Sequence, residues 1–325
     1  MSPPRNALAA WFKANWRIIS QIASGCFVVA VLVLLAVLAV KVDWAEVIEA
    51  MKAYDARVLC LATLYSVASF IVYSGFDAVG KIYTEHELSW FKTMLVGFIS
   101  YAFSLNMGSA VGGAGLRLRL YSRLGLSKGA IMRVIGLSVT TNWVGYLWLA
   151  GAVFASGLMS LPAQWKIGSL ALQLIGFVLL LLGLGYLLLC ATSKKREWEI
   201  KGHSIELPSL RLALSQVAMA MLNWSLMAAI IYVLLEQSVG YFVVLGLLLI
   251  TAVAGAVVHM PAGLGVIETI FIGGLYYYSV ARADILAALV AYRAVYYLIP
   301  LFFAGLSYFA IESRISSTAN LDSEP

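Results

Sequence analysis

Long apolar runs separated by short polar stretches dominate the chain. Most of them approach the roughly 20 residues that a helix needs to cross the hydrocarbon core of a bilayer. The pattern predicts an all-α, polytopic integral membrane protein with about eight membrane segments, one or two of them re-entrant or broken. The runs cover 18–40, 57–80, 93–111, 131–157, 168–192, 212–235, 241–259, 266–280 and 285–311.

Composition agrees with this class. Of the 325 residues, 62% are hydrophobic and 12% are charged, whereas soluble domains average about 25% charged residues. This excludes a soluble enzyme, a nucleic-acid-binding protein and a disordered scaffold. We expect one transmembrane domain over 1–312 and a short polar tail over 313–325. No nucleic acid, metal or cofactor is expected as a partner.

The region after the first run looks different. Residues 42–57 alternate charged residues with apolar ones at helical spacing, which predicts a short amphipathic helix in the membrane interface. The run 18–40 is longer than the apolar part of a cleavable signal peptide. We therefore expect it to be a retained first membrane segment.

The basic residues predict an orientation. They gather in the N-terminal segment and in the stretches Leu116–Arg133 and Ser193–Arg211, so these three parts should face the cytoplasm together with the C-terminus. Counting segments then leaves 93–111 with cytoplasm at both ends. A hairpin that enters the membrane and returns would satisfy both ends. The alternative is that the charge rule fails here and the segment spans.

Two glycine-rich breaks interrupt the apolar runs. The first contains Gly112, Gly113 and Gly115, and the second contains Pro261, Gly263 and Gly265. Breaks in corresponding halves, entered from opposite faces, are typical of an inverted repeat and mark the substrate site in many transporters. The alternative is that the two turns arose independently, for tight packing of helices.

Glu268 opens a helix within an apolar region, where a lone charge is costly. Arg293, inside the last apolar run, is the partner that we expect for it. Such a pair could open to admit a polar lipid headgroup, or it could be a static bridge between two helices. Asn106, beside the first break, is a further candidate for the site, and Asp77 is expected to be an anchor near a helix end.

Arg117 and Arg119 follow the first break directly. An arginine near a helix N-terminus suits a phosphate, because the guanidinium donates two parallel hydrogen bonds and the helix end favours an anion. We therefore expect both residues to bind the phosphate of a membrane lipid. The alternative is an ordinary cluster of basic residues at the cytoplasmic membrane surface.

The two breaks also carry a family resemblance. Asn106-Met-Gly-Ser-Ala-Val-Gly-Gly-Ala-Gly-Leu-Arg117 resembles the first signature of the lysylphosphatidylglycerol synthase transmembrane family. Pro261-Ala-Gly-Leu-Gly-Val-Ile-Glu268 resembles the second, usually written PGGLGxxE, with Ala262 in place of the first glycine. The similarity covers most of the chain, from about residue 15 to residue 312.

In that family the transmembrane unit is the flippase half of multiple peptide resistance factors, which moves aminoacylated phosphatidylglycerol between leaflets. These 325 residues show no aminoacyl-transferase domain, so lysine transfer is not expected. Residues 121–126 and 140–143 are similar to the stand-alone bacterial inner-membrane branch. An anionic phospholipid and a polyprenyl-linked lipid both stay open as substrates.

The resemblance thus implies a lipid translocase of the inner membrane that is not an enzyme. Arg117 and Arg119 would hold the lipid phosphate, and Glu268 and Arg293 would line the polar path. Two alternatives remain. One is a non-transporting membrane partner of a lipid-synthesising enzyme, and the other is an unrecognised membrane enzyme. Against the enzyme, the sequence contains no HExxH, GxSxG or P-loop motif.

Overall fold

The computed structural model describes residues 43–159, 168–200, 203–258 and 265–321, together with Val29, Val33 and Val40. The chain divides into two compact units, Met1–Glu49 and Ala50–Pro325. The predicted segment 18–40 therefore falls almost wholly outside the described residues, as do Pro261 and Gly263 of the second break.

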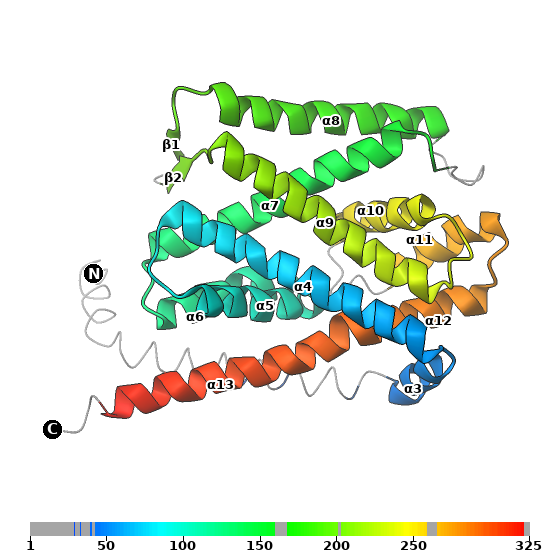
Figure 1. The fold of residues 1–325 in the computed structure, drawn as a ribbon, viewed down its shortest axis with the longest axis horizontal. Helices are drawn as coiled ribbons and strands as arrows, with labels where there is room; N and C mark the ends of the chain where they lie inside the picture. The colour runs from blue at the N-terminus through cyan, green and yellow to red at the C-terminus, as the bar shows by residue number, and fades with distance from the viewer. Residues whose placement is uncertain are drawn as a thin grey trace, which may run out of the picture. The chain divides into compact units, whose positions relative to one another are not determined.

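The described chain is helical almost throughout, as Figure 1 shows, which confirms the predicted all-α membrane class. The elements are α3 (Trp44–Lys52), α4 (Ala56–Thr84), α5 (Trp90–Met107), η1 (Ser109–Gly115), α6 (Leu116–Arg123), α7 (Lys128–Ala155), α8 (Ser169–Thr192), β1 (Glu197–Ile200), β2 (His203–Glu206), α9 (Leu210–Leu234), α10 (Tyr241–Val258), α11 (Val266–Leu275), η3 (Tyr276–Tyr278), α12 (Arg282–Arg293), η4 (Ala294–Leu298) and α13 (Ile299–Leu321).

Four stretches among the described residues are long and apolar enough to cross a membrane. They are α4, α8, α9 and the continuous stretch Arg282–Ser313, which joins α12, η4 and most of α13. The 28 residues of α7 run between α8 and α9 and pack against both. The last helix continues to Leu321, so most of the predicted polar tail is helical. The predicted amphipathic helix is confirmed as α3.

Polar caps explain where several helices begin. The side chain of Asp55 accepts a hydrogen bond from the Arg57 N–H at the start of α4, and Ser89, Ser127 and Ser209 do the same for α5, α7 and α9. Each cap satisfies an N–H group that the helix itself leaves without a partner. The sequence therefore fixes the ends of these helices where the chain leaves the apolar core.

The first break forms a hairpin, although its limits differ from the predicted ones. Helix α5 is continuous to Met107, the chain turns at Gly108, and η1 with α6 returns beside α5. A Cβ atom on Gly112 would overlap the backbone of Phe103, and Tyr121 Oη lies 3.4 Å from Thr93 O. The two limbs are thus antiparallel. The predicted segment 93–111 thus contains most of the first limb and the turn, whereas most of the return limb, 109–123, lies after it, because α5 stays helical as far as Met107.

Helices α10 and α11, on either side of the second break, form another hairpin. Gly274, near the end of α11, packs against Leu247, near the start of α10, so these two helices are also antiparallel. In Figure 1 this hairpin enters the bundle from the end opposite to that of α5 and α6. The two hairpins therefore open toward opposite ends of the bundle, which is the arrangement that the inverted-repeat interpretation predicts.

The two basic stretches lie at one end of the bundle (Figure 1). Tyr83 Oη, at the end of α4, donates a 2.6 Å hydrogen bond to Glu206 O in β2. At the other end, burial and the nearby carboxylates of Glu236 and Asp284 raise the pKa of Tyr54 to about 12. The charge pattern of the sequence thus identifies correctly which loops share an end.

One element had not been predicted. Strands β1 and β2 form a small antiparallel hairpin within the stretch Ser193–Arg211, with Glu197 opposite Glu206. Two strands of four residues give a weak sequence signal, and the surrounding basic residues mask it. The hairpin adds a polar projection to the basic end of the bundle.

Candidate functional site

A turn of π-helix interrupts the last long helix directly after Arg293. This turn, η4, covers Ala294–Leu298 and is followed by Pro300. Proline has no N–H to donate to the carbonyl four residues earlier, which is that of Tyr296, and its ring crowds this carbonyl. The wider turn relieves that conflict. Such π-turns occur frequently at functional sites, because they offer backbone groups to other partners.

Side chains from two other helices bind to η4. Ser66 Oγ in α4 donates a 3.1 Å hydrogen bond to Val295 O. Asn106 Nδ2, at the end of α5, donates to Ala102 O at 2.8 Å and to Tyr297 O at 3.4 Å. Asn106 is buried. The tip of the first hairpin is thereby tied to the interrupted helix.

The second hairpin is tied to the same place by an ion pair. Arg293 Nη2 lies 2.7 Å from Glu268 Oε1, and the two side chains are 22% and 24% exposed. The predicted partnership of Glu268 and Arg293 is therefore confirmed. Charges in a membrane segment are costly unless they are paired or reach water. The two charges are matched and both side chains are partly exposed, whereas the Arg293 Nη2 atom that makes the contact is buried.

Glu268 has a second contact that explains its position. Its Oε2 accepts a 2.9 Å hydrogen bond from the Gly265 N–H, which forms the reciprocal part of a capping box at the start of α11. Gly265 has φ = 81°, a conformation that residues with a Cβ rarely adopt. The capping contact thus holds the Glu268 carboxylate at the start of α11, directly after the second break.

Arg117 has a different environment from the one expected for a phosphate ligand. Its Nε lies 3.0 Å from both carboxylate oxygens of Asp77, and its Nη2 lies 2.8 Å from Asp77 Oδ1. Arg117 and Asp77 are almost fully buried. The Leu116 N–H bonds to Val111 O, because α6 continues η1. Arg117 therefore has neither the free guanidinium nor the free helix end on which the prediction depended.

Asp77 is the anchor expected from the sequence, and its partners are now defined. Tyr121 Oη donates a 2.8 Å hydrogen bond to Asp77 Oδ2, and the Arg117 guanidinium lies 5.8 Å from the ring centre of Tyr73. Arg117 and Tyr121 belong to the return limb of the first hairpin, whereas Asp77 and Tyr73 belong to α4. This cluster fixes the hairpin to the bundle.

Arg119 lies closer to the surface and contacts the last helix. Its Nε donates a 2.9 Å hydrogen bond to Tyr308 Oη, and its Nη2 donates to Glu312 Oε1 at 2.9 Å. Arg123 pairs with the same carboxylate. Arg119 and Glu312 are 11% and 14% exposed. The contacts tie α6 to α13 at the basic end of the bundle.

The glycines of the first break allow its two limbs to approach. At Gly112 any side chain would overlap the backbone of Phe103 and Ser104, and at Gly113 a Cβ would lie 3.1 Å from Ser104 Oγ. Gly115 has more space, with Ala110 O at 3.4 Å from its Cβ position. Of these three glycines, Gly112 is therefore the one whose replacement the close approach of the limbs forbids.

A chain of hydrogen-bonded, buried hydroxyl groups connects η4 to neighbouring helices. The sequence did not predict it. Tyr101 Oη is 2.8 Å from Tyr296 Oη, which is 2.7 Å from Ser69 Oγ, and Ser69 Oγ donates to Asn223 Oδ1 at 2.7 Å. These residues come from α5, η4, α4 and α9. The bond between Ser69 and Asn223 joins α4 to α9, as polar side chains within membrane helices commonly do. The tyrosines at 292, 296 and 297 were the sequence signal for this network.

Across the described ranges, no group of three or more His, Cys, Asp or Glu side chains is placed to hold a metal ion. The polar groups that meet at η4 are a carboxylate, a guanidinium, an amide and hydroxyls.

Comparison with known proteins agrees with this architecture. Residues 22–304 match the model of the lysylphosphatidylglycerol synthase TM region. The chain belongs to this family. It is 44% identical over 300 residues to inner membrane protein YbhN of Escherichia coli (strain K12), with 92% of this chain and 94% of YbhN covered.

A cyanobacterial relative is more distant. The chain is 31% identical over 275 residues to the uncharacterized protein slr0712 of Synechocystis sp. (strain ATCC 27184 / PCC 6803 / Kazusa), covering 83% of this chain and 84% of that protein. The resemblance drawn from the two glycine-rich breaks is therefore confirmed. Membership connects this multi-pass membrane protein with membrane lipids.

Proposed function

We propose that this protein is a translocase that moves an anionic phospholipid or a related lipid between the leaflets of the bacterial inner membrane. The ion pair of Glu268 and Arg293 carries the proposal, since it is matched, a little over one-fifth exposed and placed where the second hairpin meets the interrupted helix. An anionic headgroup would contact Arg293 while Glu268 keeps its hydrogen bond to Gly265. Family membership supports a lipid substrate.

The two hairpins supply the parts that move. They open toward opposite ends of the bundle, and both contact the segment 293–298. A shift of η4 would therefore alter the two hairpins together. Arg119 would bind a lipid phosphate at the basic end when it leaves Glu312, and this end would face the cytoplasm together with the chain termini. Arg117 would position the first hairpin through Asp77.

A translocation assay tests the proposal. Purified protein is reconstituted into liposomes that contain headgroup-labelled phosphatidylglycerol or cardiolipin, and a leaflet-specific quencher reports movement of the label. We expect faster movement with the wild type than with empty liposomes, and loss of this gain in Glu268→Gln and Arg293→Gln. Glu197→Gln, an exposed carboxylate in β1, is the matched control.

The same assay separates the alternatives. Wild-type protein that accelerates neither lipid contradicts the proposal for these two substrates and favours the role of a partner for a lipid-synthesising enzyme. Mass spectrometry of the liposome lipids identifies an enzyme, because a reaction would change the mass of the lipid, whereas translocation leaves it unchanged.

A further inference from the structure

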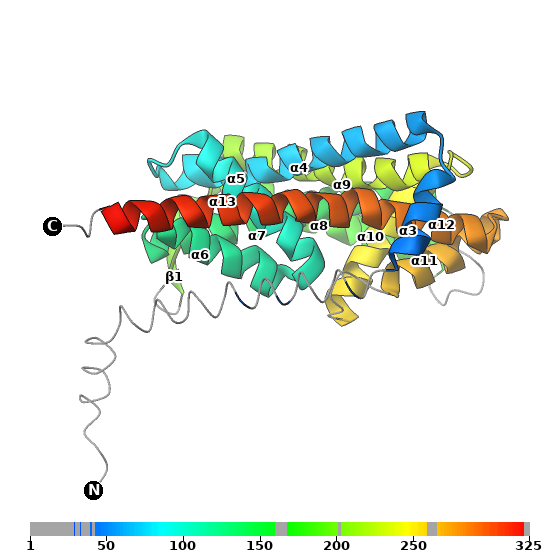
Figure 2. The same ribbon diagram turned by 90° about the horizontal axis from the view of Figure 1, so that it is seen from below.

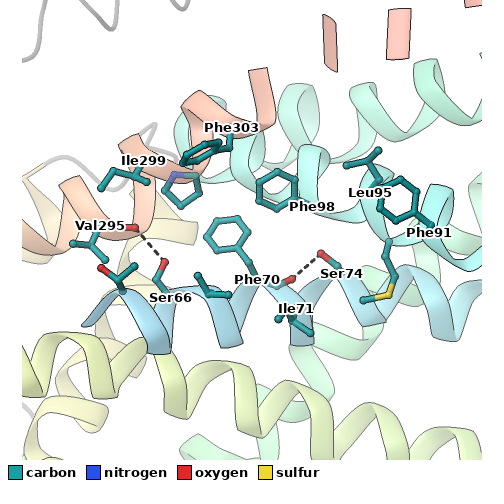
Figure 3. A pocket seen from close by; sticks show the side chains of 14 residues that line it. Ser66, Phe70, Ile71, Ser74, Phe91, Leu95, Phe98, Val295, Ile299 and Phe303 are labelled. Carbon is teal, nitrogen blue, oxygen red and sulfur yellow. Dashed lines mark hydrogen bonds between the residues drawn. The ribbon is translucent and has the colours of Figure 1, made fainter. Parts of the chain in front are cut away.

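An apolar groove runs along the outer side of α4, between α5 and the start of α13. Its volume is about 500 Å³. Figure 3 shows Phe70 and Ile71 from α4, Phe98 from α5, and Val295 and Phe303 from the last helix around it. The walls on α4 and α5 follow helical spacing, at positions 63, 66, 67, 70, 71 and 74 and at positions 91, 94, 95 and 98.

The groove offers almost no polar group to a ligand. Three hydroxyl side chains line it, those of Thr63, Ser66 and Ser74. Ser66 Oγ donates to Val295 O at 3.1 Å and Ser74 Oγ donates to Phe70 O at 2.7 Å. The dashed lines in Figure 3 mark these two bonds. Both serine hydroxyls donate to backbone carbonyls, so apart from Thr63 at one end the side chains present mainly hydrocarbon to an occupant. A headgroup would lose its hydration here and gain no hydrogen bond.

The groove is long enough for an acyl chain. Its wall on α4 runs from Thr63 to Ser74, which at 1.5 Å per residue is about 17 Å. Its wall on α5 continues to Phe91, beyond the level of Ser74, because Gly97 of α5 lies beside Ser74. The groove is therefore longer than half of the hydrocarbon core of a bilayer, which is about 15 Å thick. An acyl chain that enters beside Phe91 would reach Val295 of η4.

The end of the groove beside Phe91, at the start of α5, has side chains typical of a membrane surface. Phe91 lines it, the neighbouring Trp90 and Lys92 are exposed, and Lys81 Nζ lies 5.5 Å from the ring centre of Trp90. Aromatic and basic side chains at such a position are typical of the headgroup level. An anionic phosphate at this end would be attracted by the two lysines.

We propose that this groove binds one acyl chain of an anionic phospholipid, with the headgroup beside Lys92 and the chain end beside Val295. The role of the groove in transport rests on the proposed function. Val295 belongs to η4, which immediately follows Arg293 of the ion pair. A lipid held here would thus have its tail against the segment to which both hairpins are tied.

Photo-crosslinking tests the groove without requiring transport. Phosphatidylglycerol with a diazirine in one acyl chain is mixed into proteoliposomes, irradiated, and the labelled peptides are identified by mass spectrometry. We expect the label mainly in residues 63–74 and 295–303. Ile71→Trp should lower it several-fold, because the indole fills the groove. Leu64→Trp is the matched control, since Leu64 is 59% exposed, Ile71 is 57% exposed, and only Ile71 lines the groove.

Two results would overturn the proposal. They are labels spread evenly onto other exposed apolar helices such as α8, and labels that Ile71→Trp leaves unchanged. The translocation assay is scored separately. Labelling of the groove without translocation rejects the translocase and keeps the lipid site, whereas translocation without labelling rejects the site alone.

Discussion

The guanidinium of Arg117 contacts both carboxylate oxygens of Asp77, although 40 residues separate the two in the sequence. The contact joins the return limb of the first hairpin to α4 in a place that excludes water. Three N–H···O contacts join the guanidinium to the two carboxylate oxygens. They satisfy buried donors and acceptors that would otherwise have no hydrogen-bond partner. The hairpin depends on this pair for its position.

Removal of one member should unfold or loosen the hairpin. Arg117→Gln leaves the carboxylate of Asp77 buried without its cation, which typically costs about 3–5 kcal/mol. We expect a large loss of stability in Arg117→Gln and a smaller loss in the double variant Asp77→Asn/Arg117→Gln, which leaves no unpaired charge. Thermal and denaturant unfolding in detergent measures both.

An exposed arginine provides the control for that comparison. Arg57→Gln, in the first turn of α4, should leave stability nearly unchanged because its side chain is exposed. A loss in Arg117→Gln no larger than that in Arg57→Gln would show that the pair does not support the fold. Translocation by Arg117→Gln is informative only if the variant is folded.

Gly112→Ala should be destabilising for a steric reason. A Cβ atom there overlaps the backbone of Phe103 and Ser104, and backbone cannot move aside as a side chain can. We expect a loss of about 1–3 kcal/mol, the usual cost of overpacking. Gly136→Ala, in α7, meets no atom within 4 Å and is the control. Equal unfolding temperatures for the two variants would contradict the tight approach of the hairpin limbs.

The ion pair at the second break should act as a unit. Glu268→Gln keeps a side chain that can cap Gly265, because glutamine serves at this position of a capping box, so the variant should stay folded. If the charges function together, Glu268→Gln/Arg293→Gln should translocate lipid no more slowly than either single variant. Losses that add independently in a double-mutant cycle would argue against a shared role.

His86 should make the stability depend on pH. Burial and the nearby charge of Lys81 lower the pKa of His86, and the carboxylate of Asp77 offsets part of this effect. The unfolded chain, with an ordinary histidine pKa near about 6.5, then binds more protons than the folded protein does. Stability should therefore fall as pH drops below about 6.5.

The histidine variant isolates this contribution. In His86→Gln the fall in unfolding temperature between about pH 6.5 and pH 5 should be shallower than in the wild type. The Lys81 Nζ contact to His86 O involves the backbone and can persist in the variant. Parallel pH profiles for the two proteins would show that another group is responsible.

Several features of the site followed from the sequence because local physics determines them. Lengths of apolar runs gave the membrane class, and the basic residues indicated which loops share an end. An ionisable residue in an apolar region needs a partner, and this reasoning paired Glu268 with Arg293 correctly. The glycine-rich breaks located both hairpins, since a continuous helix is unfavourable there.

Other features depended on the tertiary structure. The sequence predicted that Arg117 binds a lipid phosphate. In the structure the hairpin packs against α4, and Arg117 forms an ion pair with Asp77. The hydroxyl chain through Tyr296 and the apolar groove beside Val295 each combine residues from three or more segments that are distant in sequence. The spacing of apolar residues shows that one face of a helix is packed, but it does not identify the helix against which that face packs. The sequence alone therefore determined the membrane class, the breaks and the need for charge pairing, and only the packing of helices decided which charges meet.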